Sequence, residues 1–145
     1  MLLADSAQAV GGKLYILGAG WSLIGPAPSP FAIAIKFDVP WDAANTRHQI
    51  RLELLSSDGQ PVQVPGPVGP QPLVVTTAIE VGRPPGLARG TPLEVPFAIN
   101  FGPIPLQAGR YEWRCTVEGA NISESCAFTV REAPPPGQQI VVPQQ

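Results

Sequence analysis

Hydrophobic and polar side chains alternate along much of this chain. In residues 31–39 the odd positions are apolar, whereas Lys36 and Asp38 lie at even positions together with two alanines. Residues 93–101 and 111–118 show the same period of two. Because successive side chains of a β-strand point to opposite faces, each segment predicts a strand with one buried and one solvated face, as in an antiparallel sheet.

Weaker alternation predicts further strands, and these are residues 2–10, 13–17, 47–55, 61–64, 73–81 and 122–130, which brings the expected total to about nine. Three pairs of turn-forming residues predict hairpins, namely Gly11-Gly12, Asp58-Gly59 and Glu118-Gly119. No segment keeps a 3.6-residue period, and only residues 40–45 suit a helical turn. We therefore expect an all-β fold, a single antiparallel β-sandwich that is Ig-like or has a related Greek-key topology.

Proline and glycine delimit the predicted strands. The segments richest in both predict loops, and these are residues 25–30, 65–72 and 82–92. Pro96 interrupts the alternating run 93–101. Because proline cannot donate a hydrogen bond to a neighbouring strand, we expect this strand to lie at a sheet edge or to contain a bulge.

Composition narrows the class of protein. The 145 residues include 15 glycines and 19 prolines, but 44% are hydrophobic and only 14% charged, which favours a folded domain over a disordered chain. The net charge is −2, with no basic cluster, so no nucleic-acid partner is expected. Neither a signal peptide nor a membrane span is predicted, because a charge, proline or glycine interrupts every apolar run. We expect a cytoplasmic protein without a membrane partner.

The C-terminal segment and two tryptophans are the candidate interaction residues. We expect a β-sandwich domain over residues 1–131 and a tail over 132–145 that is rich in proline and glutamine. Within the tail, Ile140, Val141 and Val142 suit a strand added to an open sheet edge of a neighbouring subunit. Trp21 follows a glycine bend and Trp41 follows a proline, positions that favour aromatic plugs at the ends of a sandwich, with a carbohydrate-stacking platform as the alternative.

Cys115 and Cys126 are the only cysteines, and the register of the last hairpin decides their relationship. If Glu118-Gly119 is a two-residue loop, the sulfurs lie too far apart for a disulfide. If the loop is centred on Ala120-Asn121, the cysteines are direct partners and a bond is compatible with the geometry. Both have the parity of the buried face, and we favour two reduced core thiols.

No arrangement of residues matches a known catalytic, cofactor-binding or metal site, and we predict that the protein is not an enzyme. His48, the only histidine, has the parity of a buried strand face and suits a hydrogen-bonded structural role. Asp5 is expected opposite Gly18, where its carboxylate would accept hydrogen bonds from the amides of the Gly18-Ala19-Gly20 bend. Tyr111 stands where Ig-like sandwiches place a tyrosine whose hydroxyl binds a nearby backbone group.

The N-terminal run from Leu2 to Val10 and the following Gly12 to Trp21 resemble the start of a family of small, uncharacterised bacterial proteins, mostly actinobacterial. The similarity extends over most of the chain before the tail, and the C-terminal hairpin resembles Ig-like modules generally. The family implies no activity. We expect a non-catalytic protein–protein interaction or structural module, such as a subunit of a larger assembly. The alternatives are a carbohydrate- or small-ligand-binding sandwich and a hydrolase that uses Asp5 and His48.

Overall fold

The computed structural model describes residues 1–137, and the fold over these residues is all-β, with a single 3-10 turn, η1 (Trp41–Ala43). The strands are β1 (Leu2–Ala4), β2 (Ser6–Val10), β3 (Lys13–Leu17), β4 (Leu23–Ile24), β5 (Phe31–Val39), β6 (His48–Ser56), β7 (Gln63–Gly66), β8 (Gly69–Pro72), β9 (Val74–Ile79), β10 (Leu93–Phe101), β11 (Gly109–Val117) and β12 (Ile122–Val130). The predicted fold class is confirmed.

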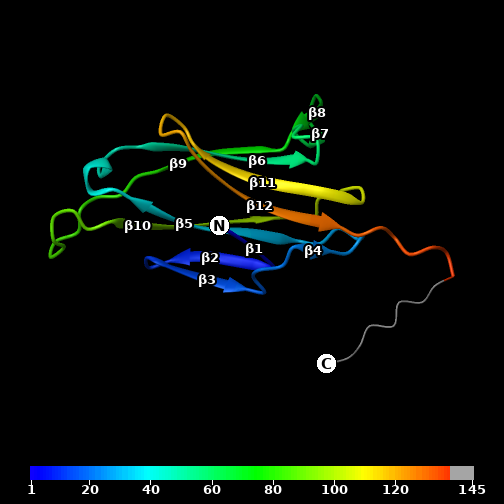
Figure 1. Cartoon of the computed structure of the whole chain (residues 1–145), viewed down its shortest axis with the longest axis horizontal. Coiled ribbons are helices and arrows are strands. Elements are labelled where there is room, and N and C mark those ends of the chain that lie inside the picture. The colour runs from blue at the N-terminus through cyan, green and yellow to red at the C-terminus, as the bar shows by residue number, and fades with distance from the viewer. Residues whose placement is uncertain (138–145) are drawn as a thin grey trace.

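Two sheets enclose the main core (Figure 1). One has three strands in the order β1-β5-β10, and the other has five in the order β4-β12-β11-β6-β9. All neighbours run antiparallel except β4 and β12, which are parallel. The largest fully buried side chains are Trp113, Ile33, Ile50, Leu52 and Leu54, and all five lie at positions that the period of two placed inward.

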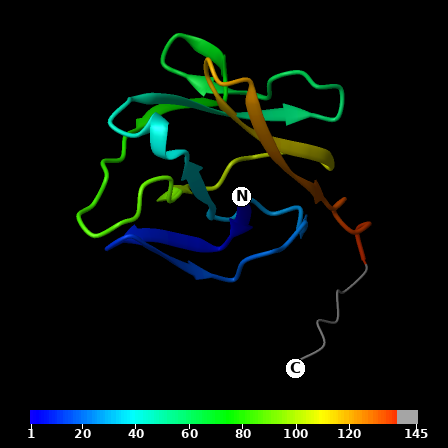
Figure 2. The same ribbon diagram turned by 60° about the vertical axis from the view of Figure 1, so that its left-hand side comes forward.

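A third layer, the hairpin β2–β3, covers part of the outer face of the three-stranded sheet (Figures 1 and 2). Ala7 of this hairpin packs against Ala32 and Ala34 of β5, and all three are buried. The prediction that the even face of β5 is solvated is therefore wrong for its first half, because the small alanine side chains let a second layer approach closely. Lys36 and Asp38, beyond the hairpin, form an exposed ion pair as expected for a solvated face.

The predicted strand over residues 2–10 is divided at Asp5. β1 pairs with β5 in the sandwich, whereas β2 pairs with β3 in the overlying layer. At the junction the Asp5 amide donates to the Leu17 carbonyl at 3.0 Å. The chain thus leaves the sandwich and enters the hairpin within one residue, a change of layer that alternation alone does not indicate.

Proline positions bring one confirmation and one correction. β10 is an edge strand, as Pro96 predicted. Residues 65–72, predicted as a loop, instead form most of the hairpin β7–β8, in which Pro65 faces Pro70. Each strand of a two-stranded ribbon has one open edge. Proline is tolerated there because an N–H that would point to the open edge forms no hydrogen bond between strands.

The turns follow the expected chemistry with one difference in length. Gly11 and Gly12 have φ of 57° and 74° and join β2 to β3 with Val10 opposite Lys13, as predicted. In the last hairpin Val117 faces Ile122, so residues 118–121 form the loop, which is longer than a Glu118-Gly119 turn.

The described part of the tail, residues 132–137, is exposed and extends beyond the end of β12 (Figure 1). The domain residue just before it is held in place, because the Arg131 amide donates to the Ile24 carbonyl at 3.0 Å. Ile140, Val141 and Val142 lie outside the described residues. Among residues 1–137, no helix has the length and apolar character required to cross a membrane.

Candidate interaction surface

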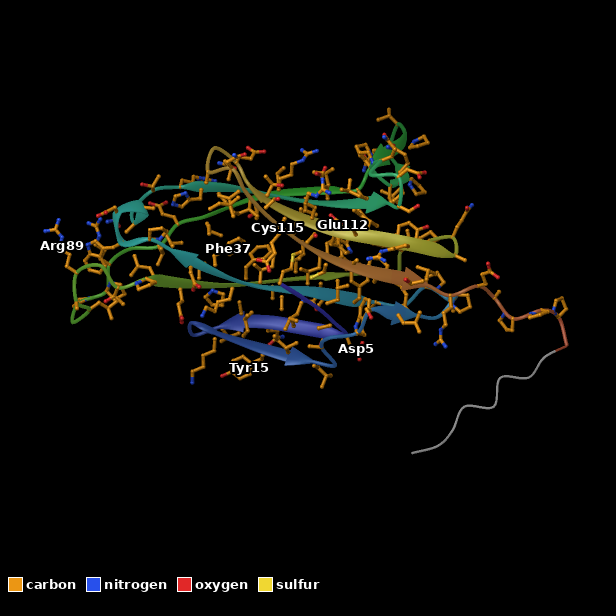
Figure 3. All side chains as sticks on the ribbon, viewed as in Figure 1. Asp5, Tyr15, Phe37, Arg89, Glu112 and Cys115 are labelled. Atoms are coloured by element: carbon orange, nitrogen blue, oxygen red, sulfur yellow. The ribbon has the colours of Figure 1, made fainter. Side chains whose placement is uncertain are left out.

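The outer face of the hairpin β2–β3 exposes three large apolar side chains, Val10, Tyr15 and Leu17, which we call the hairpin patch. Their exposed fractions are 57%, 57% and 69%. All three point away from the sandwich because Ala7 and Leu14, at the alternate positions, pack against it. Figure 3 shows Tyr15 on the side of the hairpin opposite the core. Isolated exposed apolar residues are ordinary, but three that share one face of a small ribbon make this face a candidate binding surface.

Asn100 of β10 fixes the hairpin to the sandwich. Its Oδ1 accepts a hydrogen bond from the Ala7 amide at 3.2 Å, and its Nδ2 donates to the Ala7 carbonyl at 2.7 Å. The side-chain amide thus satisfies the two backbone groups that a neighbouring strand would otherwise bind. The patch consequently lies on an element held by hydrogen bonds as well as by packing.

The end of the hairpin remote from the turn is held by the backbone. The Gly20 amide donates to the Leu3 carbonyl at 2.9 Å. Asp5 lies directly against Gly18, as predicted: a Cβ added to Gly18 would come within 2.7 Å of the Asp5 Cγ. The predicted side-chain hydrogen bonds are not formed, because within residues 1–137 the Asp5 carboxylate accepts none and the Gly20 amide binds Leu3 instead.

A shallow, open hollow adjoins the hairpin patch. Polar and apolar groups both contribute to it, and its lining residues are Ser6, Ala7, Gln8, Tyr15, Ile16, Leu17 and Asn100. The hollow is shaped by the crossing of the hairpin over β10. A partner that covers the patch would therefore also meet hydrogen-bonding groups.

Trp21 and Trp41 lie at opposite ends of the sandwich. Trp21 packs edge-on against Phe31, the first residue of β5, at a ring-centroid distance of 6.2 Å. Trp41 lies two residues beyond Val39, the last residue of the same nine-residue strand, which is about 26 Å long. The Arg83 guanidinium lies 5.1 Å from the Trp41 ring and donates to the Trp41 carbonyl at 2.8 Å. The two tryptophans therefore do not form a shared stacking platform.

His48 and Asp5 are similarly separated. The His48 Nε2 donates to the Ala43 carbonyl at 2.9 Å, which joins β6 to η1 and matches the structural role expected for this histidine. Asp5 lies at the other end of β5, beside a hollow that Phe31 lines. These two residues do not form a catalytic pair. In the part of the chain that the structure describes, no cluster of three or more His, Cys, Asp or Glu suits a metal ion.

The cysteines occupy an intermediate register. Cys126 faces Trp113 and Cys115 faces Glu124, so the two cysteines are diagonal neighbours, and both are free thiols. The Cys126 thiol donates to the Met1 carbonyl at 3.1 Å. Burial raises the pKa of both thiols. The expectation of two reduced thiols on the inner face agrees with this arrangement.

Tyr111 makes the backbone contact predicted for it. Its hydroxyl donates to the Gln107 carbonyl at 2.9 Å, and its ring stacks on Phe128 with centroids 5.7 Å apart. Tyr111 therefore links the start of β11 to the segment that precedes this strand.

Sequence reasoning missed the hairpin patch and Asn100. One indication of the patch was present, since β3 carries apolar side chains at both parities, Leu14 and Ile16 on one face and Tyr15 and Leu17 on the other. Strands that are covered on both faces commonly show this pattern. Nothing in the sequence indicated Asn100, because its contact joins residues 93 positions apart.

Similarity to other proteins covers the same part of the chain as the described domain. A model of a protein family described as a family of unknown function, DUF6941, matches residues 1–131. This range agrees with the extent of the resemblance expected from the sequence. No curated protein matches the chain.

Proposed function

Because the chain belongs to DUF6941, a family of unknown function, we propose a function from its structure: the protein is a non-catalytic interaction module that docks another protein through the hairpin patch. The sandwich acts as the scaffold, and the hairpin β2–β3 is the element that meets the partner. The proposal does not require a cofactor or a bound metal.

The observation that carries the proposal is the outward exposure of Tyr15 and Leu17 on a hairpin that Asn100 holds in place. A two-stranded ribbon alone is only marginally stable in water, so it needs such an anchor to keep a defined surface. Tyrosine also combines a large apolar area with few rotatable bonds, which suits it to binding surfaces.

The placement of the ionisable and nucleophilic side chains supports a non-catalytic role. His48 and Asp5 occupy opposite ends of β5, and both thiols have a raised pKa, which disfavours the reactive thiolate. The separation of Trp21 from Trp41 speaks against the carbohydrate-platform alternative, although it leaves each tryptophan as an individual contact.

Two finer assignments belong to this proposal. The hydroxyl bond of Tyr111 supports an Ig-like arrangement of the C-terminal hairpin. The free thiols of Cys115 and Cys126 support a reducing compartment, which in a bacterial cell is the cytoplasm. A bacterial, mostly actinobacterial distribution of the family is supported only by the resemblance of the N-terminal sequence.

Site-specific photocrosslinking tests the proposal without requiring that the partner be identified beforehand. A benzophenone amino acid replaces Tyr15 in one variant and Val68 in another, in cells that produce the protein. Val68 is fully exposed at the tip of the β7–β8 hairpin, on the far side of the molecule, and serves as the matched control (Figure 1). We expect a discrete protein adduct at position 15 that Leu17→Lys abolishes, and none at position 68. Equal adducts at both positions, or none at position 15, would contradict docking through the patch.

A further inference from the structure

The outer edge of β3 offers backbone hydrogen-bonding groups that have no strand beside them in the described part of the chain. The amide and carbonyl of Ala7 in β2 bind the Asn100 side chain, so these two groups of Ala7 point away from β3. In an antiparallel pair, the N–H and C=O groups of two facing residues point either toward each other or away from each other. Ile16 faces Ala7, so its N–H and C=O groups point away from β2. The alternation gives the same orientation to Leu14. Within the described residues, β3 pairs only with β2.

The other sheet edges lack this combination of features. β10 carries Pro96, which removes one outward amide, and β1 and β4 have only three and two residues. β9 has no exposed large apolar side chain. Charged residues, proline and short length are the usual protections against edge pairing, and the interior of β3 has none of them. Figure 1 also places β3 at the rim of the molecule, with β2 between it and the sandwich.

We propose that β3 pairs antiparallel with β3 of a second copy of the chain, across a two-fold axis that passes beside Tyr15. This inference rests on the proposed docking through the hairpin β2–β3 and identifies the partner as the protein itself, paired along the edge of β3 beside the hairpin patch. The two hairpins then form one four-stranded sheet, in which Leu14 exchanges hydrogen bonds with Ile16 of the second copy. Both patches lie on the same face of that sheet.

The length of β3 selects this register. Pairing about Tyr15 places each of the five residues Lys13–Leu17 opposite a residue of the other β3, whereas a shift by two residues leaves part of each strand unpaired. A shift by one residue is excluded, because residues whose backbone groups point to the open edge would then face residues whose backbone groups point to β2.

Charge favours the antiparallel orientation. Lys13 stands at the turn end of the hairpin and Asp5 at the opposite end. A two-fold axis through the middle of β3 brings the Lys13 end of each copy to the Asp5 end of the other. A parallel arrangement would place the like-charged ends together, which is unfavourable at short range.

The size of the contact predicts a concentration-dependent dimer. Edge-to-edge pairing of two five-residue strands leaves the outward surfaces of both patches open, so the area it buries is below the roughly 800 Å² per partner of a standard stable interface. Strand pairing adds backbone hydrogen bonds to this area, as in other cases of strand addition. We therefore expect a monomer–dimer equilibrium and not an obligate dimer.

Sedimentation velocity over a wide range of protein concentration tests the inference, with two proline variants as a matched pair. Ile16→Pro removes an outward amide of β3 without removing a bond to β2. Ala9→Pro removes the equivalent amide on the other edge of the same hairpin, because Ala9 faces Leu14. We expect a dimer in the parent and in Ala9→Pro, and at least tenfold weaker dimerisation in Ile16→Pro. A parent that stays monomeric at all concentrations, or equal effects of the two prolines, would overturn the inference.

A cysteine variant keeps the test decisive even if Ile16→Pro does not fold. On the two-fold axis, Tyr15 faces its own copy at a non-hydrogen-bonded position, where Cα atoms lie about 4.5 Å apart, which a disulfide can span. Tyr15→Cys should oxidise to a covalent dimer, whereas Val68→Cys, equally accessible, should not. Failure of Tyr15→Cys to dimerise while position 15 still crosslinks to a chain of different mass would refute self-pairing and leave the proposed docking function intact.

Discussion

Asn100 and Ala7, 93 positions apart in the sequence, are joined by two hydrogen bonds between one side chain and one backbone unit, with lengths of 2.7 and 3.2 Å. The asparagine amide carries a donor and an acceptor with a spacing similar to that of a peptide group, so it takes the place of a neighbouring strand. This contact, and the packing of Ala7 on the alanines of β5, hold the third layer against the sandwich.

Asn100→Ala should therefore loosen the hairpin without unfolding the sandwich. It leaves the Ala7 amide and carbonyl without their protein partners, a loss of about 1–3 kcal/mol, because Ala7 is buried and water replaces the lost bonds only in part. Hydrogen exchange should accelerate over residues 6–17 and stay unchanged in β6 and β11. Asn100→Asp is the matched control, since it keeps the acceptor for the Ala7 amide and should give an intermediate effect. Uniform acceleration across the whole chain would contradict a local role.

Gly18 and Asp5 provide a second test of the hairpin anchor. Gly18 has φ of 62°, which costs an alanine about 1 kcal/mol, and an added Cβ would overlap the Asp5 carboxylate. Gly18→Ala should thus lower the free energy of unfolding by about 1–3 kcal/mol. Asp5→Ala alone should change it little, because the carboxylate accepts no hydrogen bond within residues 1–137. In the double variant, thermal denaturation should show partial recovery; additive effects would mean that the two residues do not interact.

The period of two was sufficient to predict both faces of the sandwich. Trp113, Leu52 and Ile33 each have the parity expected for a buried position, and Pro96 correctly marked β10 as an edge. These features are local. The alternation within a strand indicates which of its faces is buried, and a proline indicates that its backbone N–H is not required by a neighbouring strand.

The third layer and the surface it carries could not be predicted in the same way. Ala32 and Ala34 are compatible with either a solvated or a closely covered face, and only the position of the hairpin decides between them. The division of the first strand at Asp5 likewise depends on contacts made after the chain changes layer. Such long-range choices leave little trace in the local alternation, apart from the two apolar faces of β3.

The buried thiols make a prediction about alkaline pH. Burial raises the pKa of Cys115 and Cys126 above the ordinary value of 9.0, so the unfolded chain loses these protons first. No stability change from this source is expected below pH 9, and the free energy of unfolding should fall as the pH rises further. Cys115→Ala/Cys126→Ala removes this part of the slope, and the difference between variant and parent isolates it from other titrating groups.

The same burial protects the thiols from reagents. At neutral pH, both cysteines should react slowly with an aromatic disulfide such as DTNB in the native protein and rapidly in denaturant. Cys126, the less buried of the two by residue exposure, should react first. Rapid reaction of the native protein would show that its inner face opens on the timescale of the assay.

Truncation after Arg131 separates the two ways in which copies of this chain could associate. β12 ends at Val130, residues 131–137 are exposed, and Arg131 retains its bond to Ile24 in the truncated chain. We therefore expect the melting temperature to change by less than about 2 °C. The dimer should also persist, because β3 and not the tail forms the contact.

The sequence-based alternative predicts the opposite result for association. If Ile140, Val141 and Val142 add a strand to a neighbouring copy, the truncated chain becomes monomeric while Ile16→Pro in the full chain still dimerises. The two variants thus respond in opposite directions under the two arrangements. Sedimentation velocity on the parent, the truncated chain and Ile16→Pro, at one protein concentration above the dissociation constant of the parent, decides between an edge contact at β3 and a contact made by the tail.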